Sequence, residues 1–542
     1  MKLPLRYAIG LLAAPLPILA VAVVPAQAAQ PGTLALRGDV VPAVSQAARV
    51  GTLAASTSIQ VTVSLAQRDQ AGLQTFLKEV ADPASAQYKH YLTVKQFADR
   101  FGAAPATVAQ VSAYLKSHGL TVGKVTANGL TLSASGSAAQ VQKAFGTTIA
   151  TYRDGSGRTF YANAAAPVLP AGIAAAVTDV SGLSNYAVSH RNIAKAPQTS
   201  KASVQGYTPT QVRGAYNLTS SISAGYTGAG QTVALEEFSA FTQSDVTTYD
   251  KKFSLTPSTP VVVKSDGGTT DTSGEDEVEL DIEVVQALAP GATIKVYEAP
   301  NSDAGEAAVY AQLVSDDVPD ISTSWGQDEA AETASNRTAL NTDFQEAAAQ
   351  GQSIYAASGD SGSDDAGDGG TSVDFPASDP YVTGAGGTTL KITSSNGWSS
   401  EKAWSDSGGG VSSYFTTPSF QTPVNSGTYR AVPDVAADAD PSTGWAIYTE
   451  GSWQEFGGTS AAAPNWAAFT AIYNDEAKAK GKSSLGFANA SIYALAQSSN
   501  YKSAFHDVTS GSNGAYKAGT GYDKVTGWGS YNGGNFLSDE LG

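Results

Sequence analysis

The chain contains no cysteine and only 4 histidines among its 542 residues. Without cysteine it has no disulfide framework, no thiolate-bound zinc and no cysteine nucleophile. Basic residues are also few, because 32 Lys and Arg stand against 49 Asp and Glu, for a formal net charge of -17. This acidity argues against nucleic acid as a partner. Charged residues make up only 15% and hydrophobic residues 42%, so the chain can bury a sizeable core and is not globally disordered.

Long apolar runs are equally scarce, and the one near the start of the chain is the only candidate for a membrane-directed segment. Lys2 and Arg6 precede an apolar run over 9–24, and an Ala-Gln-Ala tripeptide at 26–28 supplies a cleavage site. We therefore expect residues 1–29 to be a signal peptide and the mature protein to be secreted and extracellular. A membrane anchor is the weaker alternative, because prolines interrupt the run and the cleavage site follows it.

A net positive charge is found only in the N-terminal part of the chain. Residues 1–190 carry 14 Lys and Arg against 7 Asp and Glu, whereas the remainder carries 18 against 42. The two parts should attract each other at neutral pH. Protonation of carboxylates in acid should weaken that attraction.

Hydrophobic spacing divides the chain into two domains and a linker. Residues 30–190 alternate strand-like and helical patterns, which predicts a small α+β domain with a split βαβ, ferredoxin-like sheet. Residues 191–206 are polar and basic and are typical of an exposed linker with a processing site. Within 207–542, short buried strands alternate with helices, which predicts a parallel α/β sheet. The strands are expected at 59–65, 149–152, 232–235, 293–297, 321–324 and 353–357, and the main helices at 73–80, 108–115, 275–289 and 338–349.

The most specific motif is Gly-Gly-Thr-Ser-Ala-Ala-Ala-Pro at 457–464. The two glycines permit a tight turn, and the alanines begin a helix. Ser460 would then lie at a helix N-terminus, where developing negative charge is favoured. A serine here could instead serve only as a helix cap. The complete pattern is rarer than a lone cap and favours a nucleophile.

A serine nucleophile requires a base, and histidine is nearly absent after the linker. His506 is the one candidate there, and it adjoins Asp507 in a Gly- and Asn-rich region that is more typical of a metal loop. No histidine lies between His190 and Ser460, so the order of subtilisin-type enzymes, with His before Ser, is excluded. The sequence therefore indicates a carboxylate base.

An acid-rich helix offers two carboxylate pairs. Glu277 and Asp281 are spaced i,i+4 on one helix face, and Glu279 and Glu283 have the same spacing. Two carboxyls one turn apart raise each other's proton affinity, so one can hold a proton while the other acts as a base. The alternative is a solvated acidic face that complements the helix dipole.

A third carboxylate lies at the end of a predicted strand. Asp360 follows the strand at 353–357 in a Gly-Asp-Ser-Gly turn, and the carboxyl edge of an open parallel sheet is where sites form. The acids that follow it, Asp364, Asp365 and Asp368, could bind a cation, but the pattern is more typical of a solvated surface loop.

Together these motifs resemble the sedolisin, or serine-carboxyl peptidase, family, and especially its kumamolisin-like bacterial members. The resemblance covers almost the whole chain and implies an activation prodomain at 30–190 and a subtilisin-like catalytic domain at 207–542. It assigns Glu277 and Asp281, rather than the other pair, to the base, Ser460 to the nucleophile and Asp360 to the oxyanion. Gly457 replaces the first serine of the family's SGTSxxxP motif.

The resemblance also implies a calcium site and a substrate-binding segment. One structural Ca²⁺ would be held near the C-terminus by two carboxylates and three backbone carbonyls, all hard oxygen ligands. A glutamate of the family's carboxylate network matches Glu237. The calcium ligands would be Asp507, Val508, Gly519, Gly521 and Asp523, and the substrate-binding segment Ser324, Trp325 and Gly326.

The expected function is that of a secreted, acid-active serine-type endopeptidase that cleaves proteins and peptides through an acyl-enzyme. It would be made as a self-processing zymogen, with its prodomain as an intramolecular inhibitor, and would contact neither nucleic acid nor, after signal removal, a membrane. Three alternatives remain at this level. They are a tripeptidyl aminopeptidase of the same family, a serine hydrolase that pairs Ser460 with His506, and a non-catalytic calcium-stabilised binding module.

Overall fold

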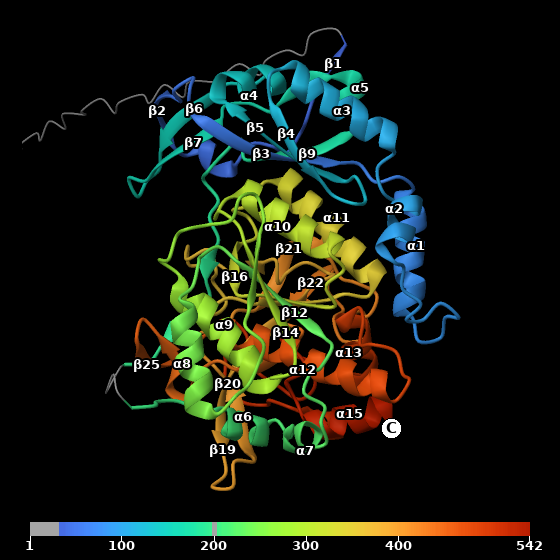
Figure 1. Ribbon diagram of the computed structural model, residues 1–542, viewed down its shortest axis with the longest axis vertical. Coiled ribbons are helices and arrows are strands. Elements are labelled where there is room, and N and C mark those ends of the chain that lie inside the picture. Colours follow the sequence, from blue (N-terminus) through green and yellow to red (C-terminus); the bar gives the residue numbers. More distant parts are fainter. Residues whose placement is uncertain (1–31, 198–202) are drawn as a thin grey trace, which may run out of the picture.

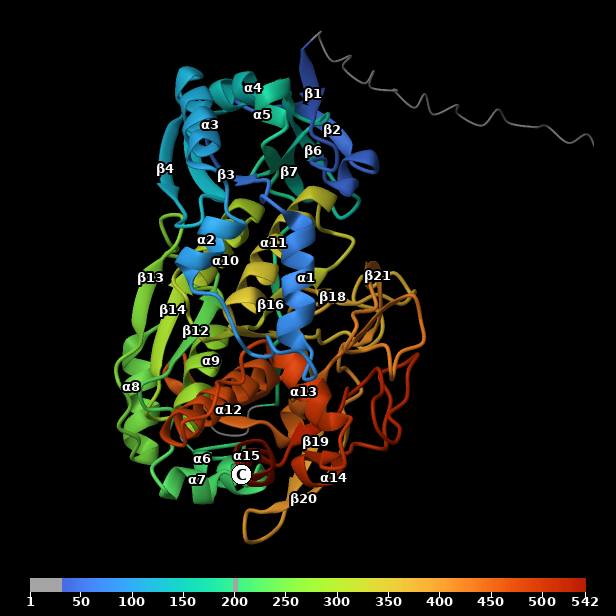
Figure 2. The same cartoon turned by 90° about the vertical axis from the view of Figure 1, so that its right-hand side faces the viewer.

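The computed structural model describes residues 32–197 and 203–542 and consists of two stacked domains (Figures 1 and 2). The predicted signal peptide and part of the predicted linker lie outside the described residues. None of the helices in the described ranges has the length and apolar character needed to cross a bilayer.

The N-terminal domain is built on a four-stranded antiparallel sheet in the order β4-β5-β3-β9. With helices between its strands, this order is that of the predicted split βαβ arrangement. In β3, Ile59, Val61 and Val63 are buried, as their alternation predicts. The sheet and its helices comprise β3 (Ser58–Leu65), α1 (Gln70–Ala81), α2 (Val94–Arg100), α3 (Pro105–Ser117), β4 (Thr121–Val125), β5 (Thr131–Ser137), α4 (Ala138–Phe145) and β9 (Val177–Ser181).

The large domain is built on an eight-stranded sheet in the order β13-β14-β12-β15-β17-β19-β20, with β23 also paired to β19. All pairs are parallel except β19–β20, which confirms the predicted parallel sheet. The strands are β12 (Thr232–Glu237), β13 (Val261–Lys264), β14 (Thr293–Glu298), β15 (Asp320–Thr323), β17 (Ser353–Ala357), β19 (Thr383–Ile392), β20 (Trp398–Ala403) and β23 (Val435–Asp438).

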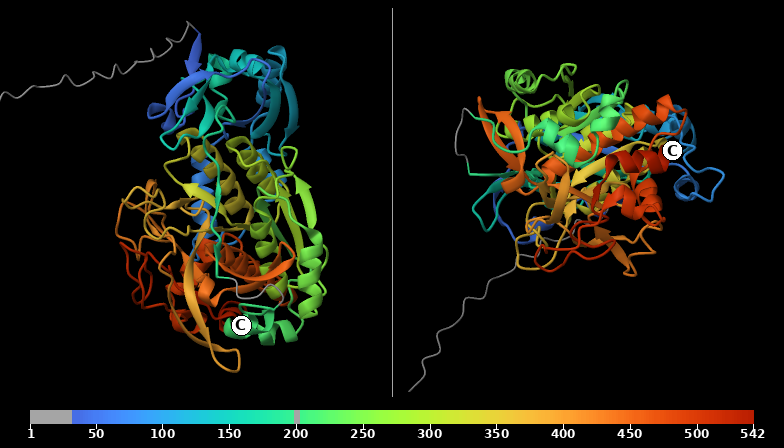
Figure 3. Two further views of the ribbon diagram at one scale, coloured as in Figure 1. Left: turned by 90° about the vertical axis from the view of Figure 1, so that its left-hand side faces the viewer. Right: turned by 90° about the horizontal axis from the view of Figure 1, so that it is seen from below.

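Helices cover both faces of this sheet (Figure 3). Helices α9 (Glu275–Leu288) and α12 (Thr459–Ala479) pack together on one face, and α10 (Asp303–Ser315) and α11 (Ala334–Gln350) cover the other. Separate apolar cores form on the two faces. The central strands β12, β15 and β17 are accordingly buried along almost their whole length.

The N-terminal domain packs against the α10–α11 layer. Ala348 and Ala349 of α11, together with Phe487, belong to the apolar core of the N-terminal domain. The Leu92 amide also donates to the Ala349 carbonyl at 2.9 Å. The contact is therefore partly a shared hydrophobic core.

The remaining elements are short or peripheral. They are β1 (Thr33–Ala35), η1 (Pro42–Ser45), β2 (Ala48–Thr52), β6 (Ile149–Arg153), β7 (Thr159–Asn163), β8 (Val168–Pro170), α5 (Ala171–Ala174), β10 (His190–Arg191), β11 (Ala194–Lys195), α6 (Pro209–Ala215), α7 (Thr219–Ser223), α8 (Gln243–Phe253), β16 (Trp325–Asp328), β18 (Asp374–Phe375), β21 (Gly410–Thr416), β22 (Tyr429–Val432), η2 (Pro441–Thr443), β24 (Trp445–Thr449), β25 (Ser452–Gly457), α13 (Ala488–Ala496), α14 (Tyr501–Ala504), β26 (Phe505–His506), β27 (Ser530–Tyr531) and α15 (Gly533–Leu541).

Candidate active site

Three neighbouring strands bring polar side chains to one edge of the large sheet. Strands β12, β15 and β17 are adjacent and parallel, so their carboxyl ends lie together. Glu237 ends β12, Ser324 follows β15, and Asp360 follows β17. This is the sheet edge at which ligands of open α/β sheets bind.

Ser460 lies in the first turn of α12, as the glycine-rich motif predicts. Gly458 precedes the helix with φ of +91°, a conformation that favours glycine. The Ser460 side chain is buried, and its hydroxyl has no hydrogen-bond partner among the described residues. A buried, unpaired hydroxyl at a helix N-terminus is well placed to react.

Glu277 faces Ser460 from the neighbouring helix α9. Burial, and secondarily the charge of Asp281, hold the pKa of Glu277 well above its ordinary value, while the Ser460 hydroxyl acts in the opposite direction. Neither oxygen of Glu277 makes a hydrogen bond of normal geometry in the described chain. The Glu277 carboxyl and the Ser460 hydroxyl are therefore close neighbours without a hydrogen bond of normal geometry between them.

Asp281 lies one turn further along α9 and is fixed by Ser324. The Ser324 hydroxyl lies 2.8 and 2.9 Å from the two Asp281 oxygens and 3.2 Å from the Ser460 carbonyl oxygen. Burial raises the pKa of Asp281 to about 8. Ser324 thus links the α9 carboxylate to the turn that carries Ser460.

Glu237 extends this carboxyl group cluster. Its Oε2 accepts a hydrogen bond from Trp325 Nε1 at 2.8 Å, and burial and Asp281 raise its pKa well above the ordinary value. The adjacent Glu236 instead accepts from the Thr323 hydroxyl. This difference supports Glu237 as the network member, as the resemblance implies.

The second carboxylate pair on α9 has other partners. Glu279 accepts from the Thr242 amide and Glu283 from the Tyr448 amide, both at 2.9 Å. Both side chains are buried, so they are not a solvated acidic face. Their contacts are with backbone segments rather than with Ser460.

Asp360 approaches Ser460 through the preceding threonine. Asp360 Oδ1 accepts from the amide of Thr459 at 2.7 Å and from its hydroxyl at 2.8 Å, while Oδ2 has no partner among the described residues. Burial raises the pKa of Asp360 to about 8. The sequence analysis did not identify Thr459, although its place in the Gly-Gly-Thr-Ser motif was a usable signal.

The linker passes directly through this site. Strand β10 pairs antiparallel with β16, and the Asn192 amide donates to the Ser324 carbonyl at 3.1 Å. The Ser460 amide donates to the Asn192 carbonyl at 2.9 Å. Strand β11 then pairs antiparallel with β25. The chain on both sides of Asn192 is therefore held as an extended strand across Ser460.

Gly458 makes this close approach possible. A Cβ at that position would lie 2.2 Å from the Asn192 carbonyl oxygen and 2.6 Å from Asp360 Oδ2. No side chain could occupy that space without displacing the linker. The sequence could not predict this arrangement, because the linker is held mainly through its backbone.

The loop near the C-terminus gathers the predicted calcium ligands. Asp523 accepts hydrogen bonds from the amides of Gly519, Val525 and Thr526, and Asp507 accepts from the amide of Gly521. Carboxylate oxygens are ligands that suit Ca²⁺, and the calcium site itself stays a prediction.

His506 packs within the C-terminal region and makes no hydrogen bond to Ser460 in the described chain. Its ring stacks on Trp398 at 4.3 Å between centroids, and its backbone pairs with Ser530. None of the hydrogen bonds in the described ranges joins it to Ser460.

Comparison with known proteins identifies both domains. Residues 45–186 match the activation domain of pro-kumamolisin, and residues 267–529 match the subtilase family. Kumamolisin from Bacillus sp. (strain MN-32) is 35% identical over 512 residues, which cover 87% of this chain and 90% of that protein. Tripeptidyl-peptidase 1 from Mus musculus is 29% identical over 531 residues, covering 88% and 90%.

A solved structure supports the same assignment. Pseudomonas sedolisin, a serine-carboxyl proteinase complexed with two molecules of pseudo-iodotyrostatin, has a TM-score of 0.57 at 32% identity. The match covers 62% of this chain and 98% of that one. The fold and the relatives define a serine-carboxyl peptidase with a subtilisin-like domain and an activation prodomain. The chain belongs to the sedolisin family, and it is the zymogen form of a peptidase.

Proposed function

We propose that this protein is a secreted, acid-active endopeptidase that uses Ser460 as its nucleophile and Glu277 as its general base. The observation that carries the proposal is the pairing of an unbonded Ser460 hydroxyl with an unbonded Glu277 carboxyl at the N-terminus of α12. Histidine is not available for this role, because His506 stacks on Trp398 instead.

The proposed reaction is acyl transfer. Glu277 takes the proton from Ser460 Oγ as that oxygen attacks the peptide carbonyl, and later returns it to the leaving amine. Burial is the main cause of the raised pKa of Glu277, so departure of the linker would return solvent to this carboxyl, lower its pKa and leave it ionised as the base in acid. The Ser460 amide and a protonated Asp360 donate hydrogen bonds to the oxyanion. Water then attacks the acyl-enzyme and releases the second product.

Further residues would position Glu277 and the substrate. Asp281, held by Ser324, orients Glu277 and shares its proton load, and Glu237 extends the network toward Trp325. Ser324, Trp325 and Gly326 would bind the substrate backbone as a strand. The pairing of β10 with β16 supports this last role.

Activity in acid follows from the proton that Asp360 must hold. A carboxylic acid donates to an oxyanion only while protonated. Asp360 has a pKa of about 8 with the linker in the cleft, so the donor is lost as pH rises through about 8. Departure of the linker would return solvent to Asp360 and lower that limit, because burial is the main cause of the shift.

The linker would act as inhibitor and first substrate. Asn192 presents its carbonyl to the Ser460 amide, so the Asn192–Ile193 bond is the proposed processing site within 191–206. Paired strands on both sides of this bond favour an endopeptidase over a tripeptidyl aminopeptidase, which would need one end of the cleft closed. The prodomain at 30–190 would hold the linker in place until it is cut.

One structural Ca²⁺ is proposed at the C-terminal loop. Asp507, Asp523 and the carbonyls of Val508, Gly519 and Gly521 would hold it. The ion would stabilise the loop and take no part in the reaction. Secretion is proposed from the signal-peptide pattern of residues 1–29.

Digestion of a peptide library by the acid-treated protein tests the function. We expect cleavage at internal bonds between pH 3 and 6, declining toward pH 8, when fragments are identified by mass spectrometry. Release of tripeptides alone would replace the endopeptidase by the exopeptidase alternative. Absence of cleavage at every pH would reject the proposal.

A further inference from the structure

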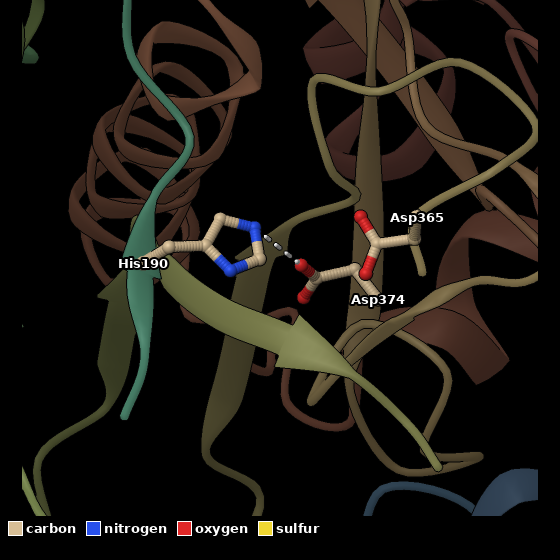
Figure 4. A group of neighbouring side chains, drawn as sticks. All are labelled: His190, Asp365 and Asp374. Atoms are coloured by element: carbon tan, nitrogen blue, oxygen red, sulfur yellow. Dashed lines mark ion pairs between the residues drawn. The ribbon is translucent and has the colours of Figure 1, made fainter. Parts of the chain in front are cut away.

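A cluster beside the cleft joins the linker to the large domain. His190 of β10, Asp365 of the loop after Asp360, and Asp374 of β18 lie together (Figure 4). Each offers a ligand atom, and these atoms lie within 4.8 Å of one another. None of the three takes part in the proposed reaction.

The carboxylates of this cluster have no hydrogen-bond partners of normal geometry in the described part of the chain. The Asp374 side chain is 0% exposed, and the Asn192 side chain is close enough to lower its pKa without making such a bond. His190 Nε2 lies 3.6 Å from Asp374 Oδ2, beyond hydrogen-bond range. Both oxygens of Asp365 are likewise buried and unpaired. No Lys or Arg of the described residues forms an ion pair with either carboxylate.

Such an arrangement is costly without a cation. Burial raises the pKa of Asp365 to about 7, and burial followed by the charge of Asp365 raises the pKa of Asp374 well above its ordinary value. The His190 imidazole presents Nε2 toward Asp374, and a ring nitrogen is a common metal ligand. Gly326 leaves room for the carboxylate, since a Cβ there would lie 2.0 Å from Asp374 Oδ1.

We propose that His190, Asp365 and Asp374 bind one divalent transition-metal ion of the zinc class in the zymogen. One imidazole nitrogen and two carboxylate oxygens are a ligand set that zinc accepts, with a position left for water. The site differs from the calcium loop, whose donors are all oxygen. It exists only while the linker lies in the cleft.

The ion would lock the linker over Ser460. This consequence rests on the proposed function, because it predicts that the metal slows the first self-cleavage. The metal site itself does not depend on activity, since all three ligands are present in an inactive precursor. Binding and processing can therefore be measured separately.

Titration of Zn²⁺ into the full-length Ser460→Ala precursor at pH 7.5 tests the site. We expect 1:1 binding by calorimetry and a higher melting temperature, in the presence of excess Ca²⁺. His190→Ala should weaken binding at least about 10-fold, as loss of a metal ligand does. His90→Ala, at an exposed histidine of the same domain, is the matched control and should bind as before.

A second variant and a spectroscopic probe test the site independently, in case His190→Ala does not fold. Asp374→Asn should also weaken Zn²⁺ binding, and bound Co²⁺ should show visible absorption that disappears in His190→Ala. The site would be overturned if Zn²⁺ does not bind, or if it binds His190→Ala as tightly as the unsubstituted precursor. The two carboxylates would then only contact the His190 side chain, without a metal. If the Ser460→Ala precursor binds Zn²⁺ but the wild-type protein digests no peptide, the metal site is supported and the proposed peptidase function is rejected.

Discussion

Two clusters of buried carboxyls, one in the cleft and one between the domains, differ in what surrounds them. The cleft carboxyls, Glu237, Glu277, Asp281 and Asp360, surround a hydroxyl without a partner. The interface carboxyls come from both domains and have mixed surroundings. They are Asp39, Asp179, Asp303, Glu306 and Glu332. The Ser181 hydroxyl contacts Asp179 and the Asn336 side chain donates to Glu332, whereas neither oxygen of Asp39 has a partner among the described residues.

The interface carboxyls are tied together across the domain boundary. The Ser181 hydroxyl of the N-terminal domain lies 2.5 Å from an Asp179 carboxylate oxygen and 2.9 Å from the side-chain oxygen of Asn336 in α11, and Asn336 donates to Glu332 at 2.6 Å. Burial raises the pKa of Glu332 to about 7 and that of Asp303 well above its ordinary value. Raised pKa values therefore mark both clusters, and only the reactive neighbour distinguishes the catalytic one.

Removal of the nucleophile should have the largest effect. Ser460→Ala should lower peptidase activity by at least about 10⁴-fold and leave the precursor uncut, because the other hydroxyl at that turn, of Thr459, is hydrogen-bonded to Asp360. Activity is measured on a fluorogenic peptide and processing by gel shift. Substantial cleavage by the purified variant would remove Ser460 from the mechanism.

The two acids on α9 provide a matched comparison within the cleft helix. Glu277→Gln should lower kcat by roughly 10²–10⁴-fold, because it removes the base. Glu279→Gln, equally buried but bonded to the Thr242 amide, should retain kcat within a few-fold. Equal losses in the two variants would mean that burial of an acid, and not contact with Ser460, determines activity.

The sequence could predict the elements and motifs of this site but not which way side chains face. Strand β17 is predicted to the residue and α9 to within one, since period and composition mark them clearly. Glu277 and Glu279 have equivalent spacing in the sequence, and the packing of α9 against α12 distinguishes them. Asp365 was interpreted as part of a solvated loop, yet its oxygens are buried by segments distant in the sequence.

The interface carboxyls predict the opposite of an expectation based on total charge. The charge asymmetry predicts that acid weakens the contact between the domains. The buried contact acts in the opposite direction, because groups with raised pKa values stabilise most when protonated. Long-range attraction between the bodies is screened beyond about 8 Å in physiological salt, so the local contact should prevail.

The interface carboxyls should make the zymogen more stable in acid. For Glu332, the stabilisation is full below about pH 4 and is lost as pH rises toward 7, the pKa in the folded protein. In the Ser460→Ala background, Glu332→Gln should reduce this pH dependence of the melting temperature by roughly 2–4 °C.

An exposed acid is the control for that change. Asp99→Asn, in a surface pair with Lys95, should leave the pH dependence unaltered. Precursor stability that rises from pH 4 to 7 would contradict the assignment and favour the charge-based expectation.

The calcium loop should give the smallest effect on chemistry. Asp523→Asn should abolish the stabilisation by Ca²⁺ in thermal melts while kcat, measured well below the melting temperature, stays within about two-fold, because Asp523 is hydrogen-bonded within its own loop and not to Ser460 or Glu277. If Ca²⁺ does not change the melting temperature of the unmodified protein, the site is wrongly assigned.

The most direct measurement is the identity of the first bond cut when the purified full-length protein is acidified. We predict that mass spectrometry will find a new N-terminus at Ile193, generated by wild-type protein and absent from Ser460→Ala. This result follows from the Asn192 carbonyl that the Ser460 amide binds at 2.9 Å. A first cut outside residues 190–196, or the same cut in pure Ser460→Ala protein, would contradict the assignment of the linker as the substrate of its own active site.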